Sequence, residues 1–211
     1  MICKAENKLQ FSVITPVSDG LLYARSMDVS RLPTDDLISI GNAESAAAAL
    51  NYGMRKAKYD LCVCCHQDVA FPPFWADGLL KLPEGFGVVG LYGMDLKGNE
   101  VGHVNDPHGY RMKGIMPCEA QTVDELCIII DRRNGLQFDE ELGGWHMYGA
   151  DICLAAMQKG LKNYVINNLV LHGSGGKMNS AYYAVRGAFV KKWQGHAPVR
   201  ELYTTCGKIL L

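Results

Sequence analysis

The chain has 211 residues, a net charge of −1, and 48% hydrophobic and 20% charged residues. This length fits one domain with a substantial core, and the near-zero charge excludes a global basic field for nucleic acid. No apolar run approaches the roughly 18 residues of a membrane span, and residues 1–8 lack the apolar region of a signal peptide.

The cysteines indicate a reducing compartment. Five of the eight lie inside apolar runs, where a free cysteine behaves as a small hydrophobic residue. We therefore predict reduced cysteines in a cytosolic protein.

The first third of the chain predicts alternating strands and helices. Runs of β-branched and apolar residues predict strands over 11–17, 37–40 and 61–69. A short helix is expected within 18–27, and the alanine run predicts a helix over 45–58. This order is typical of parallel α/β nucleotide-binding folds.

The rest of the chain continues the α/β pattern. Further strands are predicted over 87–92, 122–131 and 163–172, and helices over 75–82, 149–159 and 182–193. Residues 93–119 are rich in turn-forming residues and predict a loop or hairpin, whereas the tail from Gly195 gives no clear pattern. We predict one α/β domain with a mainly parallel central sheet flanked by helices.

The third predicted strand ends abruptly in His66, Gln67 and Asp68. Ligands of open α/β sheets bind beyond the carboxyl ends of the strands. An imidazole and a carboxylate at this place suit a metal or its phosphate partner, and the alternative is that Asp68 is only a cap or turn residue.

The stretch from Asn42 to Asp68 resembles the donor-site half of family 2 inverting glycosyltransferases. In that family a helix of small residues with an Asn-x-Gly step precedes a strand that ends in a D-x-D-type motif. Asn51-Tyr-Gly53 fits the step. His66-Gln-Asp68 occupies the D-x-D place, as in a short branch of the family whose motif reads His-Gln-Asp.

The second half is similar to the same family in the order and spacing of its motifs, and the resemblance spans residues 10–176. Family members have a Phe-Asp-Glu turn, then a Glu-Asp pair that opens a helix, then a strand that ends in His. The corresponding pieces are Val123–Arg132, Phe138–Leu142, Met147–Leu154, Gly160-Leu-Lys and His172. Ala150 stands where the Glu of the pair is expected, and Asp151 keeps the Asp.

The resemblance implies a GT-A (Rossmann-like) fold and a metal-dependent inverting glycosyltransferase of the hexosyltransferase class. Such an enzyme moves a sugar from a nucleotide-diphosphate sugar to an acceptor hydroxyl, here in bacterial surface polysaccharide or glycoconjugate synthesis. The implied cofactor is a divalent metal, Mn²⁺ or Mg²⁺. We favour Mn²⁺ because neutral imidazole suits it better.

Each motif residue has an expected role. Asp68 is expected to bind the metal, because hard oxygen donors suit these ions. His172 is expected as a second ligand or a phosphate partner, and His66 as a ligand or as a group that bonds a phosphate or ribose oxygen. Asp151 is expected to be the general base, since the start of a helix favours its ionised form; a simple helix cap is the alternative.

Other residues are expected to contact the donor. Thr15, Pro16 and Val17 end the first strand and should approach the nucleotide base. Asn42 is expected to contact base or ribose, and Asn51 either touches the donor or holds a loop. The acidic Asp-Asp-Gly-Ser stretch common in the family is missing from the second strand. We nevertheless favour a UDP-sugar.

Trp145 and His146 precede the helix that carries Asp151 and are expected to form an acceptor platform, since aromatic faces stack on sugar rings. A core role for Trp145 is the alternative. Gly173–Gly176 is either a lid over the donor or a plain mobile loop.

The expected partners are the nucleotide-sugar donor and a carbohydrate or glycolipid acceptor, with no nucleic acid and no transmembrane segment. The expected location is the cytosol, and peripheral association with the inner face of the membrane stays open. One domain over 1–211 is expected, with a donor-site half over 10–92, an acceptor and catalytic half over 93–176, and a C-terminal helix and tail over 177–211.

Two other function classes are alternatives to a glycosyltransferase. Ala150 and the histidine in the D-x-D place favour a non-catalytic nucleotide-sugar or carbohydrate-binding relative. A dinucleotide-dependent oxidoreductase is disfavoured because no G-x-G-x-x-G follows the first strand.

Overall fold

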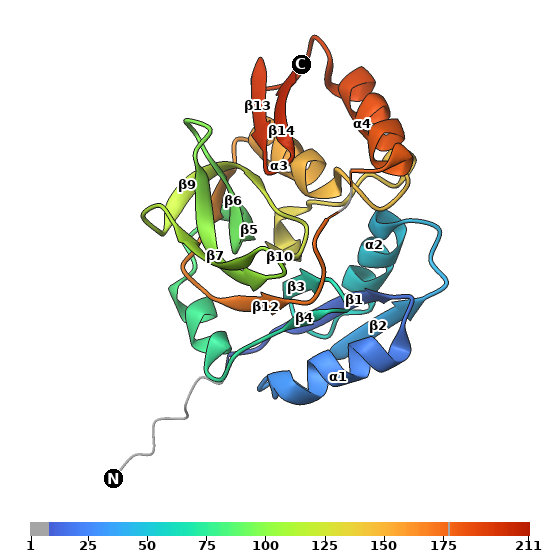
Figure 1. Cartoon of the computed structure of the whole chain (residues 1–211), viewed down its shortest axis with the longest axis vertical. Coiled ribbons are helices and arrows are strands. Elements are labelled where there is room, and N and C mark those ends of the chain that lie inside the picture. Colours follow the sequence, from blue (N-terminus) through green and yellow to red (C-terminus); the bar gives the residue numbers. More distant parts are fainter. Residues whose placement is uncertain (1–8, 177) are drawn as a thin grey trace.

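The computed structural model describes residues 9–176 and 178–211 (Figure 1). Two residues named by the predictions lie outside these ranges. They are Cys3, one of the cysteines expected to be reduced, and residue 177, where the C-terminal helix and tail were expected to begin. The α-helices are α1 (Gly20–Ser30), α2 (Ala46–Lys56), α3 (Tyr148–Gln158) and α4 (Ser180–Trp193), and the 3-10 helices are η1 (Trp75–Lys81), η2 (Arg132–Asn134) and η3 (Glu140–Leu142).

The strands fall into one large sheet and one hairpin. The large sheet contains β1 (Ser12–Val17), β2 (Leu37–Gly41), β3 (Leu61–Cys65), β4 (Val69–Ala70), β5 (Phe86–Gly90), β6 (Tyr92–Asp95), β7 (Glu100–Asp106), β8 (Gly109–Lys113), β9 (Cys118–Val123), β10 (Cys127–Asp131), β11 (Lys162–Val165) and β12 (Val170–His172). The hairpin pairs β13 (Glu201–Thr204) with β14 (Gly207–Leu210).

The order of the large sheet is β2-β1-β3-β10-β5-β11-β9-β6-β7-β12-β4, with β8 added to β7. The predicted α/β fold class is confirmed. The strands β2, β1 and β3 are parallel, as expected for the donor-site half. Beyond β3 the pairing is mostly antiparallel, because β10 inserts antiparallel between β3 and β5 and short hairpins follow. The sheet is therefore mixed rather than mainly parallel as predicted.

Helices cover both faces of the sheet near β1. Ile14 packs with α2 and α3 in one core cluster, whereas its neighbour Val13 faces the cluster that contains η1. This alternation follows from the period of two along a strand. A Cβ on Gly53 would lie 2.2 Å from Ile14 Cγ2, so the glycine lets α2 approach β1 closely.

Two predicted long strands are each broken in the structure. The run 122–131 divides into β9 and β10, and the break holds Asp124, Glu125 and Leu126. The Asp124 Oδ1 accepts a hydrogen bond from the Leu126 N–H at 3.1 Å, which is an Asx turn. The run 163–172 divides into β11 and β12.

Other local predictions also change. Residues 93–119, expected as loop or hairpin, contain β7 and β8 and supply parts of β6 and β9. The helix expected over 75–82 is the 3-10 helix η1. The tail from Gly195 forms the β13–β14 hairpin, which lies with α4 at the top of Figure 1.

The hairpin belongs to a third core cluster with α3 and α4. The Tyr203 N–H donates to Gln121 Oε1 at 2.9 Å, and the Thr122 hydroxyl donates to the Tyr203 carbonyl at 2.6 Å. These bonds attach β13 to β9 and so place the end of the chain beside the broken strand.

The cysteines and the helix lengths bear on two further expectations. The seven cysteines among the described residues are free. Over residues 9–176 and 178–211, the helices are too short or too polar to cross a membrane.

Candidate functional site

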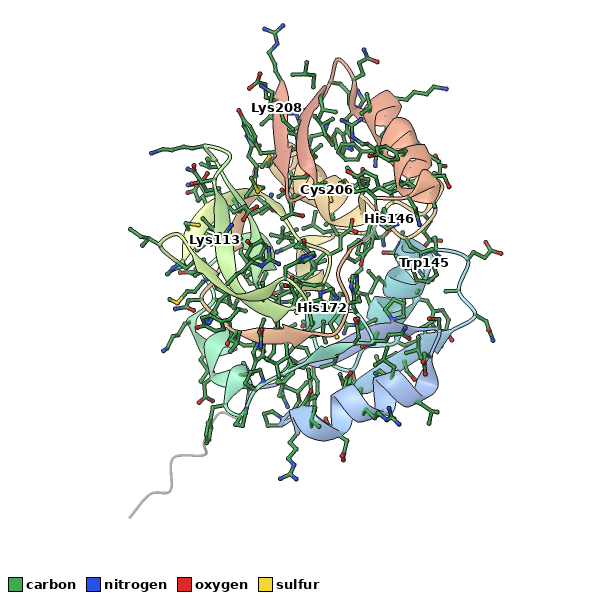
Figure 2. The ribbon with its side chains drawn as sticks, in the orientation of Figure 1. Lys113, Trp145, His146, His172, Cys206 and Lys208 are labelled. Atoms are coloured by element: carbon green, nitrogen blue, oxygen red, sulfur yellow. The ribbon has the colours of Figure 1, made fainter. Side chains whose placement is uncertain are left out.

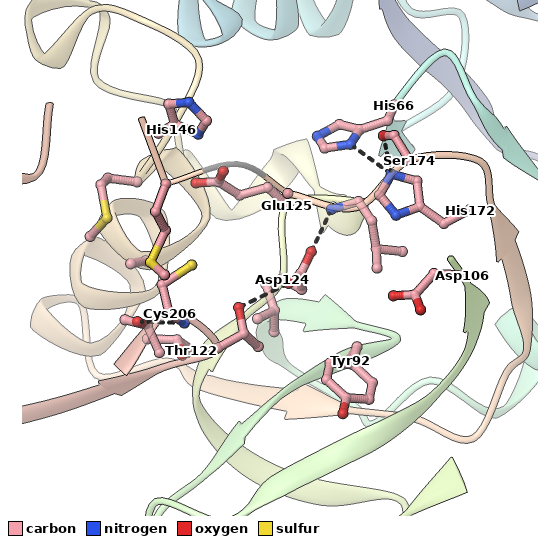
Figure 3. Close-up of a pocket in the computed structure, with 18 of the residues that line it drawn as sticks. His66, Tyr92, Asp106, Thr122, Asp124, Glu125, His146, His172, Ser174 and Cys206 are labelled. Carbon is pink, nitrogen blue, oxygen red and sulfur yellow. Dashed lines mark hydrogen bonds between the residues drawn. The ribbon is translucent and has the colours of Figure 1, made fainter. Parts of the chain in front are cut away.

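A pocket of about 420 Å³ lies between the large sheet, the start of α3 and the β13–β14 hairpin (Figure 3). Segments between residues 66 and 206 form its wall, including His66, Glu125, His172, Tyr182 and Cys206. Its volume is in the range of small-molecule sites, so the pocket can hold a ligand of the size of a sugar.

Three of the predicted residues cluster at one side of this pocket, and the two histidines among them line it. His66 follows β3, Asp68 precedes β4, and His172 ends β12, which pairs with β4 so that His172 lies opposite Val69. His66 Nδ1 lies 3.3 Å from His172 Nε2, and Asp68 Oδ1 lies 3.4 Å from the same nitrogen. One ligand atom from each residue falls within 4.8 Å of the others.

This donor set fits a divalent metal. Two imidazole nitrogens and one carboxylate oxygen suit Mn²⁺ and related first-row ions. Burial, followed by the neighbouring His172, lowers the pKa of His66 to about 4, so His66 is neutral at pH 7 with a lone pair free for a metal. Burial would raise the pKa of Asp68, but hydrogen bonds from His172 and Ser174 outweigh it and hold that pKa well below its ordinary value.

Gln67, between the two ligand candidates, is tied to the loop after β1. Its Oε1 accepts hydrogen bonds from the N–H groups of Ser18 and Asp19 at 2.8 and 2.9 Å. Its Nε2 donates to the Ser18 hydroxyl at 3.0 Å. The middle residue of the motif therefore fixes the loop that precedes α1.

Sequence reasoning missed the carboxyl groups of Asp124 and Glu125, which line the pocket (Figure 3). Glu125 Oε1 accepts a hydrogen bond from the Gly149 N–H at 3.1 Å, in the first turn of α3. Burial raises the pKa of Glu125 to about 8. Asp124 Oδ2 accepts from the Thr205 hydroxyl at 2.9 Å. Two acidic residues inside an apolar run were the available signal of a strand break.

Asp151 is placed differently from expectation. It is 2% exposed and does not line the pocket, whereas its neighbour Ala150 does. Its carboxylate accepts hydrogen bonds from Lys192 Nζ at 2.7 and 2.9 Å and from Trp193 Nε1 at 2.7 Å. As a correction, Asp151 does not converge with Asp68 and His172 on this pocket, because its side chain points to α4.

The residues expected at the nucleotide lie around the end of β1. Thr15 is buried, with its hydroxyl 3.3 Å from Cys65 Sγ, and Pro16 and Val17 are half-buried at the end of the strand. Asn42 is exposed after β2 with a φ of 55°. None of these four lines the 420 Å³ pocket.

Asn51 makes structural contacts, in line with the loop-holding role that was one of its two expected ones. Its Nδ2 donates to the Phe138 carbonyl at 2.8 Å and to Glu140 Oε1 at 2.9 Å. Its Oδ1 accepts from the Phe138 N–H at 3.0 Å. These bonds join α2 to the segment before η3.

The two residues expected at the acceptor do line the pocket (Figure 2). Trp145 is 48% exposed, so it is not a core residue. His146 packs edge-on against Tyr182 at 5.6 Å between ring centroids, and burial lowers its pKa. Ser174 and Gly176 also line the pocket, which puts the glycine-rich loop after β12 at its rim.

Comparison with known proteins gives one relative in sequence and several in structure. The chain is 26% identical to "ATP synthase subunits region ORF 6" of Fuscovulum blasticum, over 99% of this chain and 93% of that protein. No model of a protein family matches the sequence.

The structure is similar to solved glycosyltransferases. They include GalNAc-T7 with UDP, GalNAc and Mn²⁺ (TM-score 0.65, 15% identity, 90% of this chain and 49% of that chain). Others are the mannosyltransferase PcManGT of Pyrobaculum calidifontis with GDP-Man and Mn²⁺ (0.53, 12%, 81% and 58%) and TarS of S. aureus with UDP (0.52, 13%, 79% and 61%).

The chain therefore has the GT-A fold of these enzymes. It spans about half to three fifths of the length of the solved chains.

Proposed function

We propose that this protein is a metal-dependent, inverting glycosyltransferase that uses a nucleotide-diphosphate sugar. The observation that carries the proposal is the cluster of His66, Asp68 and His172 within a GT-A fold, whose two histidines line the pocket. Solved neighbours of this fold were crystallised with Mn²⁺ together with UDP or GDP-Man.

Asp68 and the two histidines would hold the ion, with Mn²⁺ favoured over Mg²⁺ by the imidazoles. A bound divalent ion neutralises the diphosphate leaving group. The protein's own part is to fix the donor. In this proposal the ends of β1 and β2, with Thr15, Pro16, Val17 and Asn42, hold the nucleotide base and ribose.

We transfer the role of general base from Asp151 to Glu125. The carboxyl of Glu125 lines the pocket, whereas that of Asp151 already accepts bonds from Lys192 and Trp193. The ionised form of a carboxyl group with a raised pKa is a stronger base toward an acceptor hydroxyl, and for Glu125 that form predominates above about pH 8. In this proposal Glu125 removes the proton as the acceptor oxygen attacks the anomeric carbon from the side opposite the leaving diphosphate, which inverts the configuration.

The proposed donor is a UDP-sugar and the proposed acceptor a carbohydrate or glycolipid hydroxyl, placed against Trp145 and His146. The proposed setting is bacterial surface polysaccharide or glycoconjugate synthesis in the cytosol, where sugar nucleotides are made. The donor-site half over 10–92 and the acceptor half over 93–176 remain the proposed division, and Tyr182 and Thr204–Cys206 complete the acceptor side.

The test combines calorimetry with a transfer assay over a panel of nucleotide sugars with Mn²⁺. Asp68→Ala should abolish Mn²⁺-dependent donor binding, since it removes the carboxylate ligand. Glu125→Gln should keep donor binding and lose at least about 100-fold in turnover, as removal of a general base typically does. Asp151→Asn is the matched carboxyl control and should keep most of the turnover of the folded protein.

Unchanged nucleotide affinity of Asp68→Ala with Mn²⁺ would contradict the metal site. Full turnover of Glu125→Gln, together with its loss in a stably folded Asp151→Asn, would return the base to Asp151. Donor binding without transfer to any acceptor would favour the second candidate, a non-catalytic nucleotide-sugar-binding protein, for which Ala150 at the pocket wall is the supporting observation.

A further inference from the structure

Tyr148 contacts His66, one of the three candidate metal ligands. It is the first residue of α3 and is 7% exposed. Its hydroxyl lies 2.9 Å from His66 Nε2 and 3.2 Å from the Glu125 carbonyl oxygen. The other ring nitrogen of His66, Nδ1, faces His172 Nε2 at 3.3 Å and is therefore the nitrogen on the side of the cluster.

These contacts define the hydrogen-bond pattern. A phenol has one hydrogen to donate, and a carbonyl oxygen only accepts. When the Tyr148 hydroxyl donates to the Glu125 carbonyl, its lone pair accepts the N–H of His66 Nε2, and all three groups are satisfied. A neutral imidazole with its proton on Nε2 carries a lone pair on Nδ1. Only this tautomer presents a ligand atom to a metal held with His172 and Asp68.

The Tyr148 ring is held firmly enough to act in this way. It packs edge-on against Phe138 at 5.8 Å between ring centroids. The backbone of Phe138 is fixed in turn by both ends of the Asn51 amide. The next residue, Gly149, donates its N–H to the Glu125 carboxyl at 3.1 Å. The hydroxyl therefore has a fixed position relative to His66.

We propose that Tyr148 is a positioning residue for the metal, which holds His66 in the Nε2-protonated tautomer with Nδ1 directed at the ion. The inference rests on the metal site of the proposed function and extends it to a residue outside the ligand set. Groups that bond the outer nitrogen of a ligand histidine typically change metal affinity by about 10–100-fold. Tyr148 touches neither donor nor acceptor in this account.

The experiment is calorimetric titration of the full chain with MnCl₂ in the absence of nucleotide. Tyr148→Phe keeps the ring and its contact with Phe138 but removes the hydroxyl. We expect its Kd for Mn²⁺ to rise about 10–100-fold. Tyr92→Phe is the matched control, since Tyr92 is a buried pocket tyrosine whose hydroxyl bonds Glu100 rather than a ligand histidine. Its Kd for Mn²⁺ should stay at the wild-type value.

A second measurement uses the wild-type chain and does not depend on the variant's folding. Long-range ¹H–¹⁵N spectra of the metal-free protein should show His66 protonated at Nε2. An Nδ1-protonated His66, or an unchanged Kd in folded Tyr148→Phe, would overturn the role of Tyr148. Loss of Mn²⁺ binding in Asp68→Ala, alongside either result, would show that the metal site itself stands. A wild-type chain that binds no Mn²⁺ would overturn the site and Tyr148's role together.

Discussion

Glu125 and Asp151 are two carboxyl groups at the first turn of α3 with opposite surroundings. Glu125 faces the pocket and receives one backbone N–H, from Gly149, whereas Asp151 receives a lysine ammonium and an indole N–H. Burial also raises the pKa of Asp151, but hydrogen bonds from Lys192 and Trp193 act against it. The polar partners, rather than burial, distinguish the two groups.

The raised pKa of Glu125 predicts a pH dependence of stability. The ordinary pKa is 4.5 and the folded value about 8, so the folded chain binds more protons than the unfolded chain between these values. The free energy of unfolding should therefore fall as pH rises from about 4.5 to about 8 through this group. Urea unfolding of the metal-free protein at a series of pH values measures the slope.

Glu125→Gln should flatten this slope and raise stability at pH 8 relative to wild type. Glu84→Gln, at an exposed glutamate, should leave the slope as it is. Equal slopes in wild type and Glu125→Gln would show that Glu125 is ionised at its ordinary pKa in the folded chain.

At the residue scale, the three predicted metal-ligand candidates do cluster, whereas the side chain of Asp151 points elsewhere. His66, Asp68 and His172 each end or follow an apolar run, and such positions converge at one edge of a sheet. Glu125 sits inside an apolar run that also fits a continuous strand. The position of Asp151 at a helix start was correct, but the direction of its side chain depends on α4, which lies about 40 residues further along the chain.

Besides its buried apolar residues, the helix α4 has a partly buried ionic contact with the core. Lys192 Nζ lies 2.7 Å from Asp139 Oδ2 and 2.7 Å from Asp151 Oδ1. Trp193, 2% exposed, adds its indole N–H to Asp151. Because α4 carries Tyr182, this contact also positions one side of the pocket.

Lys192→Met should destabilise the protein by leaving the Asp151 carboxylate buried without its cation. Breaking a buried pair in this way costs about 3–5 kcal/mol, and we expect about 2–3 kcal/mol here because the lysine is partly exposed. Denaturant unfolding measures the loss. Lys191→Met, at the exposed neighbour, is the control and should change stability by less than about 0.5 kcal/mol. A loss for Lys192→Met no larger than the control's would remove the ionic contact as the anchor of α4.

Two glycine substitutions should have opposite effects. A Cβ at Gly187 in α4 meets nothing within 4 Å, so Gly187→Ala should raise the free energy of unfolding by about 0.5–1 kcal/mol through helix propensity. A Cβ at Gly93 in β6 would lie 2.2 Å from the Thr122 carbonyl oxygen. Gly93→Ala should therefore destabilise by about 1–3 kcal/mol. Thermal unfolding of both variants tests the pair, and a stabilising Gly93→Ala would contradict the close approach of β6 and β9.

At the scale of elements, local patterns predicted where helices and strands occur but not where long runs break. The apolar periodicity of 122–131 and 163–172 does not show that each run serves two different neighbours. β9 pairs with β6 and β11, whereas β10 pairs with β3 and β5. The β13–β14 hairpin was missed because its strands are short and are stabilised by contacts with β9.

The whole molecule assembles the pocket from segments far apart in the sequence. His66, Glu125, His172 and Thr205 all contribute to its wall. The α/β class could be predicted because strand and helix patterns alternate along the chain. The antiparallel insertion of β10 between β3 and β5 could not, since pairing partners are set by contacts across the whole sheet.

Ligands that bind only this assembled state should stabilise the whole chain. At 100 times its Kd, a ligand adds about 2.7 kcal/mol to the free energy of unfolding. For a chain of this length that corresponds to a rise in Tm of about 5–10 °C. We expect UDP with Mn²⁺ to give such a rise in a thermal-shift assay and EDTA to remove it. An equal rise with UDP in the presence of EDTA would mean that the nucleotide binds without the ion.

The side-chain amide of Gln67 has a further consequence, because it links the candidate metal ligands to the segment before α1. The Gln67 side chain, between His66 and Asp68, is hydrogen-bonded to Ser18 and Asp19. These bonds hold the segment after β3 against the segment that leads into α1. If an ion bound at Asp68 moved this residue, the segment of Ser18 and Asp19 would be pulled with it. Three hydrogen bonds would therefore link a metal site at Asp68 to the N-cap of α1, because Asp19 is that cap.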